Sequence, residues 1–461
     1  MKQQAKTLEV VVLAAGQGKR MASNHPKVLH PLAGRPLLRH VLDTVAALQP
    51  SRVHVVVGHG AESVRAAVAD DVTWVMQAER LGTGHAVSQA LPGIADDSLV
   101  LVVYGDVPLI GAATLQACAD AAAGEAVALV TAELEEPAQL GRILRDADGG
   151  ICGIVEYRDA DAGQRDIREI NSGIMAAQRS ILAPLLAKLS PDNAQGEYYL
   201  TDVVGLAVEQ GIPVQGLTVA DPEEVAGIND RAELAAMERR CQRRHVAALM
   251  AAGVSVADPE RVDVRGRVSA GRDCFIDVNV VLEGDVRLGD DVYLGPGVVL
   301  RDSSLGDGVR VEAHTVVEGA RVAAGCILGP FARLRPGTEL AEDVKIGNFV
   351  ETKKTLMGRG SKANHLAYLG DATVGEDCNV GAGAVTCNYD GIDKHPTVIG
   401  DNVFVGTNTT LVAPLEIETG AYVAAGSTVT SKVNAGELAV GRGRQRNIQG
   451  WRRPDQRKER S

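Results

Sequence analysis

The chain has 461 residues, of which 45% are hydrophobic and only 3% aromatic, and 51 are glycine. This length is too great for one ordinary core, so we expect two domains built from small aliphatic residues and tight turns. The formal net charge of -12 argues against nucleic acid as a partner, because most of the surface would repel a phosphate polymer.

The seven cysteines are scattered along the chain and form no C-x-x-C pair. This spacing argues against a zinc site and against a disulfide framework, and it predicts reduced, mostly buried thiols. The N-terminal residues show no signal peptide, and no apolar run reaches the ~18 residues that a membrane span needs. We therefore expect a cytoplasmic protein that is not inserted in a membrane.

From residue 8 to about residue 220, short apolar runs alternate with longer amphipathic stretches such as Leu37–Leu48. This alternation predicts an α/β domain with a mainly parallel sheet, whose ligands bind at the carboxyl ends of the strands. The predicted strands are Leu8–Leu13, Val53–Val57, Val72–Met76, Leu99–Tyr104 and Ala126–Thr131. Between Asp230 and Ala252 the apolar residues take helical spacing, which predicts one long connecting helix closed by Gly253, with Asn229 or Asp230 as its cap.

After Val254 an aliphatic residue recurs at every sixth position, as at Ile276, Leu282, Leu288, Leu294 and Leu300. A six-residue period is typical of a parallel β-helix, in which each short strand points one aliphatic side chain inward. The period breaks at residues 355–368 and 388–397, where we expect loops on the outer face. The predicted domains are therefore residues 1–231, a helical linker at 232–252, and a β-helix at 253–461 with a basic tail.

The first predicted strand runs into a loop of small residues. Leu13, Ala14, Ala15 and Gly16 are followed by Arg20 and Lys27. Small residues let backbone amides approach a nucleotide's phosphates, and the two cations neutralise the charge that amides leave. The loop lacks both G-x-G-x-x-G and the Gly-Lys-Ser/Thr of a P-loop, so dinucleotide oxidoreductases and P-loop kinases both lose support.

Two further segments follow predicted strands, one from Gln77 to His85 and one containing Tyr104, Gly105 and Asp106. Together with the loop they resemble the sugar-nucleotide pyrophosphorylase family, in which the aspartate holds Mg²⁺ against the nucleotide's phosphates. The resemblance implies a nucleotide and sugar site that includes Leu13, Ala14, Ala15, Gly16, Lys27, Gln77, Gly82, Thr83, Tyr104, Gly105, Asp106, Gly141, Glu156, Asn171 and Asn229. It also implies that Asn229 shares the metal with Asp106.

In the β-helix, the segment from Gly358 to Asp371 carries His365 and Tyr368. Transfer of an acetyl group to a sugar amine needs a base, and histidine suits this role because its ordinary pKa lies near 6.5. We choose His365 because we expect it in a loop that interrupts the β-helix, near Arg335 and Lys353. Hexapeptide repeats alone would indicate only the fold.

Both halves together resemble one bacterial family, the bifunctional N-acetylglucosamine-1-phosphate uridyltransferases/glucosamine-1-phosphate N-acetyltransferases. The segments that carry the resemblance include Lys27–His30, Gly82–His85, Asn193–Tyr199, Gly329–Gly337, Gly347–Glu351 and Thr386–Asp390. It implies a left-handed β-helix, a homotrimer that shares each acetyl-transfer site, and UTP and acetyl-CoA as co-substrates. The product, UDP-N-acetylglucosamine, would serve peptidoglycan and lipopolysaccharide synthesis.

Carried over residue by residue, the family's pattern makes His365 the base, with Arg20 and Lys27 as catalytic cations of the other site. Arg335 and Lys353 would bind the sugar phosphate, and Tyr368 and Asn379 would position the sugar. The residues implied for acetyl-CoA are Ala382, Asn388, Tyr389, Thr407, Ala425 and Arg442.

The chain departs from the family at Gln139-Leu140, where Gly-Tyr is common, at Asn364, where some members have Gly, and at Thr407, where Ser is common. Two alternatives stay open. One is a single-activity nucleotidyltransferase whose β-helix only trimerises or senses an effector, and the other is a non-catalytic sugar-nucleotide-binding module. The basic residues after Arg442 receive no function, since a charge run is usually a solvated tail.

Overall fold

The computed structural model describes residues 7–16, 18–68, 71–451 and 453–454. These residues form two compact units, Met1–Cys241 and Gln242–Ser461. Helix α8 (Arg231–Ala251) begins in the first unit and ends in the second. Asp230 caps it as predicted, since its Oδ1 accepts hydrogen bonds from the amides of Ala232 and Glu233.

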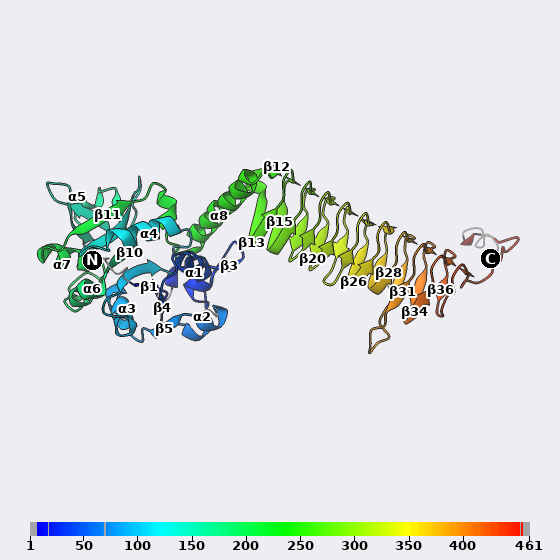
Figure 1. The fold of residues 1–461 in the computed structure, drawn as a ribbon, viewed down its shortest axis with the longest axis horizontal. Coiled ribbons are helices and arrows are strands. Elements are labelled where there is room, and N and C mark those ends of the chain that lie inside the picture. Colours follow the sequence, from blue (N-terminus) through cyan, green and yellow to red (C-terminus); the bar gives the residue numbers. More distant parts are fainter. Residues whose placement is uncertain (1–6, 17, 69–70, 452, 455–461) are drawn as a thin grey trace, which may run out of the picture. The chain divides into compact units, whose positions relative to one another are not determined.

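The first unit is an α/β layer around one sheet with the strand order β11-β7-β10-β6-β1-β4-β5 (Figure 1). The strands are β1 (Leu8–Leu13), β4 (Arg52–Val57), β5 (Thr73–Met76), β6 (Leu99–Tyr104), β7 (Val127–Glu133), β10 (Glu169–Gln178) and β11 (Val214–Thr218). A hairpin, β8 (Arg142–Arg145) and β9 (Ile151–Val155), adds to β10, and β2 (Pro31–Leu32) pairs with β3 (Arg35–Pro36). The helices are α1 (Leu37–Ala47), α2 (Ala61–Ala67), α3 (Thr83–Ala90), α4 (Ala112–Ala121), α5 (Ala162–Arg165), α6 (Arg179–Leu186) and α7 (Asp202–Glu209).

The sheet is mainly parallel, as predicted, because β1 pairs in parallel with both β4 and β6. Successive residues of β1 point to opposite faces, so Val10 and Val12 enter one apolar core while Val11 and Leu13 enter the other. Strand β10 is the exception, since it lies antiparallel to both β6 and β7. The sequence did not predict β10 or the β8–β9 hairpin.

The second unit is a parallel β-helix with three faces (Figure 1). The first face holds β12 (Ser255–Val256), β14 (Phe275–Ile276), β16 (Tyr293–Leu294), β19 (Arg310–Val311), β22 (Ile327–Leu328), β25 (Lys345–Asn348), β27 (Lys362–His365), β29 (Asn379–Val380), β32 (Phe404–Val405), β35 (Tyr422–Val423) and β37 (Leu438–Ala439). The second holds β13 (Val262–Ala270), β15 (Val280–Leu288), β17 (Val299–Arg301), β20 (Val316–Glu318), β23 (Arg333–Leu334), β26 (Glu351–Met357), β28 (Tyr368–Val374), β30 (Val385–Cys387), β33 (Thr410–Val412) and β36 (Thr428–Val429). The third holds β18 (Ser304–Leu305), β21 (Arg321–Val322), β24 (Glu339–Leu340), β31 (Thr397–Ile399) and β34 (Leu415–Ile417), and long strands such as β15 bend into it from the second.

Each coil of the β-helix takes 17 or 18 residues, as shown by the register of Phe275 with Tyr293 and of Tyr293 with Arg310. The inward positions are those of the six-residue period, and Ile276, Leu282, Leu294 and Leu300 are completely buried. The predicted fold is therefore confirmed for both units.

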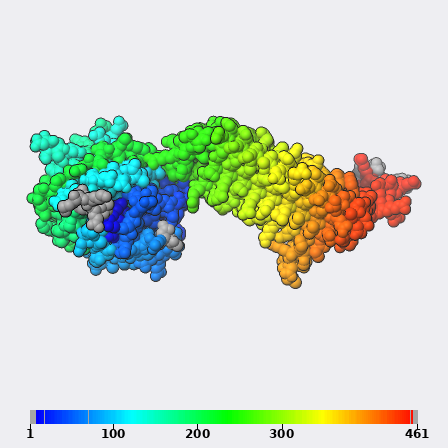
Figure 2. Space-filling view, viewed as in Figure 1, coloured from blue at the N-terminus to red at the C-terminus, as the bar shows by residue number. Residues whose placement is uncertain are grey.

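One of the two predicted interruptions is a real insertion. Val380 pairs with Val405, 25 residues on, so this coil carries seven or eight extra residues, and the segment 388–397 projects from the surface as the orange protrusion in Figure 2. The other prediction was wrong. Residues 355–368 form a regular coil, in which β27 pairs in parallel with both β25 and β29.

All seven cysteines are free, and five of them are buried, which agrees with the prediction of mostly buried thiols. Within the described part of the chain, we find no helix whose length and apolar character would let it cross a bilayer.

Candidate functional site

The small-residue loop of the first unit, which is the predicted phosphate loop, lies at the carboxyl ends of the parallel strands. The amide of Ala14 donates to the carbonyl of Val56 at the end of β4, and the amide of Gly105 donates to the carbonyl of Leu13 at 2.9 Å. Leu13, Ala14 and Ala15 are buried, and Gly16 is exposed, with open space where a Cβ would stand. The loop therefore lies between β4 and β6 and leaves room above Gly16 for a ligand.

Lys27, Asp106 and Asn229 meet although they come from three distant parts of the sequence. Lys27 lies in a short 3-10 helix, Asp106 follows β6, and Asn229 precedes α8. The Lys27 ammonium forms an ion pair with Asp106 Oδ2 and donates to Asn229 Oδ1 at 3.1 Å. The amide of Ile228 donates to the carbonyl of Asp106 at 3.0 Å, which fixes the Asn229 segment beside β6. Two side-chain oxygens thus converge on one cationic group.

Gln77, Gly82 and Thr83 form the second part of this site. The Gln77 amide group donates to the carbonyl of Gly82 at 3.0 Å, and its side chain is buried. Gly82 has a φ of 110°, and a Cβ there would come within 2.5 Å of the Tyr198 carbonyl. Thr83 starts α3, and its hydroxyl accepts from the amide of Leu200 at 3.1 Å. Only glycine fits the turn that brings these groups together.

Gly141, Glu156 and Asn171 meet around the β8–β9 hairpin. The amide of Asn171 donates to the carbonyl of Gly141 at 3.0 Å, and a Cβ on Gly141 would lie 3.4 Å from the Glu156 carboxylate oxygens. Burial raises the pKa of Glu156, while a hydrogen bond from the Thr201 hydroxyl opposes that shift. A half-buried acceptor of this kind suits recognition of a sugar hydroxyl or amide.

Tyr104 lies near both Glu156 and Asp106, whose charges act on its phenol. Burial raises the pKa of its phenol, and the charges of Glu156 and Asp106 raise it further, so the hydroxyl stays protonated. Gly173 gives the ring its space, because a Cβ there would come within 2.5 Å of a ring carbon.

The family departure at Gln139-Leu140 lies in a loop that Arg142 holds. The Arg142 side chain is completely buried and donates to the carbonyls of Leu140, Ala138 and Arg165. Ala138 has a φ of 46°, and the Leu140 side chain is 42% exposed. These hydrogen bonds hold the loop that carries Gly141, and the Leu140 side chain lies at its surface.

Arg20 is the one predicted cation that the structure does not join to this site. It lies in the 3-10 helix Lys19–Met21 with an exposed side chain, and no hydrogen bond or ion pair links it to another described residue. The neighbouring Gln17 lies outside the described residues.

In the second unit, His365 is the last residue of β27 and not part of an interrupting loop. Its Nδ1 atom lies 2.8 Å from Asn348 Oδ1, and Asn348 is its register partner on β25. Tyr368 is the first residue of β28, so His365 and Tyr368 stand on either side of one corner of the β-helix. The His365 side chain is exposed at this corner.

His365 begins a row of small residues along the first face. Because β27, β29, β32 and β35 pair in parallel, Ala382, Thr407 and Ala425 occupy the same position on the next three coils as His365 does on its own. At the end of this row the Arg442 guanidinium donates to the carbonyl of Ala425 at 2.6 Å. Four of the residues predicted for acetyl-CoA thus form one continuous track that leads from Arg442 to His365.

The corner beside this track changes from bulky to small at the same point. His314, Phe331 and Phe349 stack with ring centroids 5.2 and 5.5 Å apart, and Leu366 follows on the next coil. On the coil after Leu366, which contains β29, the same corner position is occupied by Gly383. Asn408 and Gly426 occupy it on the two coils that follow. The track is therefore open on that side only from His365 onward.

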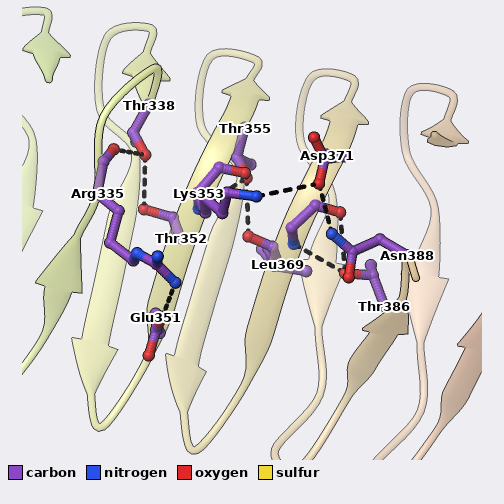
Figure 3. Close-up of polar contacts among 11 residues, drawn as sticks. Arg335, Thr338, Glu351, Thr352, Lys353, Thr355, Leu369, Asp371, Thr386 and Asn388 are labelled. Carbon is purple, nitrogen blue, oxygen red and sulfur yellow. Dashed lines mark hydrogen bonds and ion pairs between the residues drawn. The ribbon is translucent and has the colours of Figure 1, made fainter. Parts of the chain in front are cut away.

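Arg335 and Lys353 lie on the second face, on adjacent coils and in the same position (Figure 3). Upstream in this row the charges alternate, and Arg301 forms ion pairs with both Glu283 and Glu318. The alternation stops at Arg335, because the next position holds a second cation instead of a carboxylate. Two neighbouring cations without an acid between them repel each other and favour a bound anion.

The carboxylates near this pair lie to its sides. Arg335 donates to Glu351 at 2.8 Å, and the Lys353 ammonium is 3.7 Å from Asp371 Oδ2 (Figure 3). Asn388 donates to Asp371, and this bond ties the start of the insertion to the row.

Among the remaining predicted residues, Tyr368 lies at this row, because its hydroxyl stands over Gly370, the next position after Lys353. Tyr389 is 60% exposed on the insertion, with its hydroxyl donating to the Gly391 carbonyl at 2.6 Å. Asn379 starts β29 in register with Lys362, and no bond between described residues joins it to the row or to the track.

Sequence reasoning missed Asn348, Glu351 and Asp371, which contact His365, Arg335 and Lys353 respectively. Asn348 and Asp371 could have been found from the coil length alone, since they lie 17 residues before His365 and 18 residues after Lys353. A residue one coil away from a functional side chain is its neighbour in a β-helix.

Comparison with known proteins finds a matching family model in each of the two units. Residues 10–192 match the model of the MobA-like NTP transferase domain, and residues 271–302 and 396–431 match that of the bacterial transferase hexapeptide (six repeats). The bifunctional protein GlmU of Alkalilimnicola ehrlichii is 56% identical over 98% of this chain and 98% of its own length. That of Marinobacter nauticus is 53% identical over 97% and 99%. A solved UDP-glucose pyrophosphorylase in complex with UDP-glucose aligns with 52% of this chain and 99% of its own, at 15% identity and a TM-score of 0.44.

Proposed function

The chain belongs to the family of bifunctional GlmU proteins, and we propose that the two groups of residues described above carry its two activities. The enzyme transfers an acetyl group from acetyl-CoA to glucosamine-1-phosphate in the β-helix. It then joins the N-acetylglucosamine-1-phosphate to a uridylyl group from UTP in the α/β unit. The product, UDP-N-acetylglucosamine, supplies cell-envelope polymers.

In the α/β unit, a phosphate oxygen of the sugar phosphate attacks the α-phosphorus of UTP, and pyrophosphate leaves. No nucleophile from the protein is needed, because such a transfer depends on positioning and on neutralisation of charge. Lys27 supplies a cation at the phosphates, and Arg20, exposed on the 3-10 helix Lys19–Met21, supplies a second one. Gln77, Gly82 and Thr83 hold the uracil, while Gly141, Glu156 and Asn171 hold the sugar.

We assign Mg²⁺ to Asp106 and Asn229. The donor set fits this ion, since a carboxylate oxygen and an amide oxygen already converge on the Lys27 ammonium, and Mg²⁺ takes few protein ligands and keeps waters and phosphate oxygens. The described residues contain no cluster of three or more His, Cys, Asp or Glu suited to a metal. We therefore favour a site in which protein, water and phosphate oxygens together complete the coordination. When bound, the ion would neutralise charge on the phosphates.

In the β-helix, His365 takes a proton from the attacking sugar amine as its nitrogen bonds to the acetyl carbon. The carbon–sulfur bond of the thioester breaks, and CoA leaves as the thiol after it gains a proton. Arg335 and Lys353 hold the sugar phosphate, Tyr368 and Asn379 position the sugar, and the row from Ala382 to Ala425, with Asn388, Tyr389 and Arg442, holds acetyl-CoA. One observation carries this proposal. The adjacent cations Arg335 and Lys353 lie beside the same corner of the β-helix at which the track of small residues reaches His365.

We also propose the homotrimer that the family resemblance implies, and the geometry supports a neighbouring copy of the chain at this site. The track and the cation pair lie on two outer faces that meet at a corner, so the surface of one chain is convex there. A reacting thioester needs walls that exclude water. A neighbouring copy of the chain would supply the opposite wall. We further propose a cytoplasmic location, because UTP and acetyl-CoA are cytoplasmic metabolites.

The test follows free CoA thiol and pyrophosphate separately, in the wild type and in His365→Ala. We expect the variant to lose about 10²- to 10⁴-fold in acetyl transfer, the usual contribution of a general base. Pyrophosphate release from UTP and N-acetylglucosamine-1-phosphate should be unchanged. If the wild type released no CoA, the proposal would be wrong, and the β-helix would serve only as a scaffold.

A further inference from the structure

The immediate neighbour of His365 points to one more residue of the acetyl-transfer site. Asn348 is the last residue of β25, and it faces His365, the last residue of β27, in the parallel register of the two strands. The side-chain oxygen of Asn348 lies 2.8 Å from Nδ1 of the His365 ring. The contact is therefore built into the backbone pairing and does not depend on a flexible loop.

The chemistry of the contact fixes the state of the ring. An amide oxygen only accepts hydrogen bonds, so the ring nitrogen that faces it must carry the hydrogen. In a neutral imidazole one nitrogen is a donor and the other an acceptor, which leaves the lone pair on Nε2. A base in acetyl transfer needs this lone pair on the nitrogen that faces the substrate.

We propose that Asn348 is a positioning residue for acetyl transfer, which holds His365 as the Nδ1-protonated tautomer so that Nε2 accepts the proton of the sugar amine. This inference rests on the proposed role of His365. It differs from a structural role, because a residue that only stabilised the corner would not change the protonation of the base.

The identity of the residue also matters. A carboxylate in place of the amide would accept the same hydrogen bond but would favour the imidazolium form. The base would then stay protonated, and inactive, up to higher pH. The charged side chains on the packed strands β25, β27 and β29 are Lys345 and Lys362, at the opposite ends of their strands from Asn348 and His365, so no carboxylate on these strands competes for the ring.

The experiment measures kcat/KM for CoA release against pH in Asn348→Asp and Asn348→Leu, with pyrophosphate release as an internal control for folding. In Asn348→Asp we expect the acidic limb of the profile to move to higher pH, with activity preserved on the alkaline side. In Asn348→Leu we expect a fall of about 10- to 100-fold at all pH values, by analogy with the loss seen when a partner that orients a metal-bound histidine is removed.

Asn364→Asp is the matched control, because it adds the same charge at the residue next to His365. Among the described residues, Asn364 makes no hydrogen bond to the His365 ring, whereas Asn348 does. The acidic limb of Asn364→Asp should move less than that of Asn348→Asp, because its carboxylate acts only through its charge and makes no hydrogen bond to the ring. The inference is overturned if Asn348→Asp shows the wild-type profile, or if Asn348→Leu keeps full activity, in an enzyme that His365→Ala inactivates. If His365→Ala itself retains acetyl transfer, the proposed base is wrong instead.

Discussion

The two units handle a phosphate in different ways. In the α/β unit, a single lysine meets a carboxylate and an amide that come from segments up to 202 residues apart. In the β-helix, Arg335 and Lys353 stand side by side only because the coil length repeats. The first site is formed by loops at the ends of strands, whereas the second is formed by residues at equivalent positions of successive coils.

This difference determines how each site can be predicted from the sequence and how far the effect of a substitution in it should extend. At the ends of parallel strands, neighbours in space carry no fixed sequence spacing, so the site depends on the topology of the whole sheet. On a β-helix, each coil contacts only the coils beside it, and one substitution should have local consequences. Substitutions in one unit should therefore leave the chemistry of the other unit intact.

The largest expected effect comes from Asp106→Ala. The carboxylate pairs with Lys27 and is our metal ligand, so its removal should lower uridylyl transfer by more than about a thousandfold. Acetyl transfer should stay within about twofold of the wild type in a CoA-release assay. Asp106→Asn, which keeps the size and loses the charge, separates the charge effect from packing. Loss of both activities in a folded variant would contradict two separate sites.

A smaller effect is expected at the cation pair. Lys353→Ala removes one charged hydrogen-bond donor, a change of about 1.5–3 kcal/mol, which corresponds to a KM for glucosamine-1-phosphate that is about 10- to 100-fold higher. The KM for acetyl-CoA should not change, because Lys353 lies on a different face from the track.

Lys432→Ala is the control for this prediction. Lys432 is also a β-helix lysine, but it is bound to Glu416 and Glu418 and lies outside the site. An equal rise of the KM in both variants would show a general charge effect and would remove the reason for placing the phosphate at Arg335 and Lys353.

In the α/β unit, the sequence predicted the positions of the small-residue loop and of Asp106 better than it predicted the sheet. The small-residue loop and Asp106 each follow a run of buried aliphatic residues, and such runs are the clearest signal of a parallel strand. Strand β10 reads Glu-Ile-Asn-Ser-Gly-Ile-Met-Ala-Ala-Gln, with a register shift between Asn171 and Met175, so it shows no regular alternation. The convergence of Lys27 on Asn229 could not be read from spacing, because it depends on where α8 begins.

In the β-helix the same reasoning failed for a different cause. The coil that contains His365 points Thr352, Met357 and Ala363 inward, and all three are buried. A search for Val, Ile and Leu at every sixth position passes over them, and the five-residue step from Thr352 to Met357 shifts the register further. The coil was therefore taken for a loop, and that error was one of the grounds on which His365 was chosen.

The smallest expected effect tests whether the units are independent in stability as well as in chemistry. Burial alone would raise the pKa of Glu9, but hydrogen bonds from His54, from the Ala95 amide and from Ser98 lower it below the ordinary value. A carboxyl with a lowered folded pKa stabilises the fold above its unfolded pKa and loses that contribution as the pH falls through its folded pKa. Glu9→Gln should thus lower the free energy of unfolding by about 1–3 kcal/mol at pH 7, and by less below about pH 4.

Fluorescence of Trp74, on β5 of the same sheet, can follow this unfolding in denaturant once Trp451 is replaced by Phe in both proteins. Glu136→Gln, at an exposed glutamate of the same unit, is the control and should change little at any pH. Acetyl transfer in Glu9→Gln should survive denaturant concentrations that abolish uridylyl transfer, because the β-helix has its own buried core. If instead both activities disappeared together at the lower concentration, the β-helix would depend on the α/β unit for its stability, and the separation of the two sites would be chemical only.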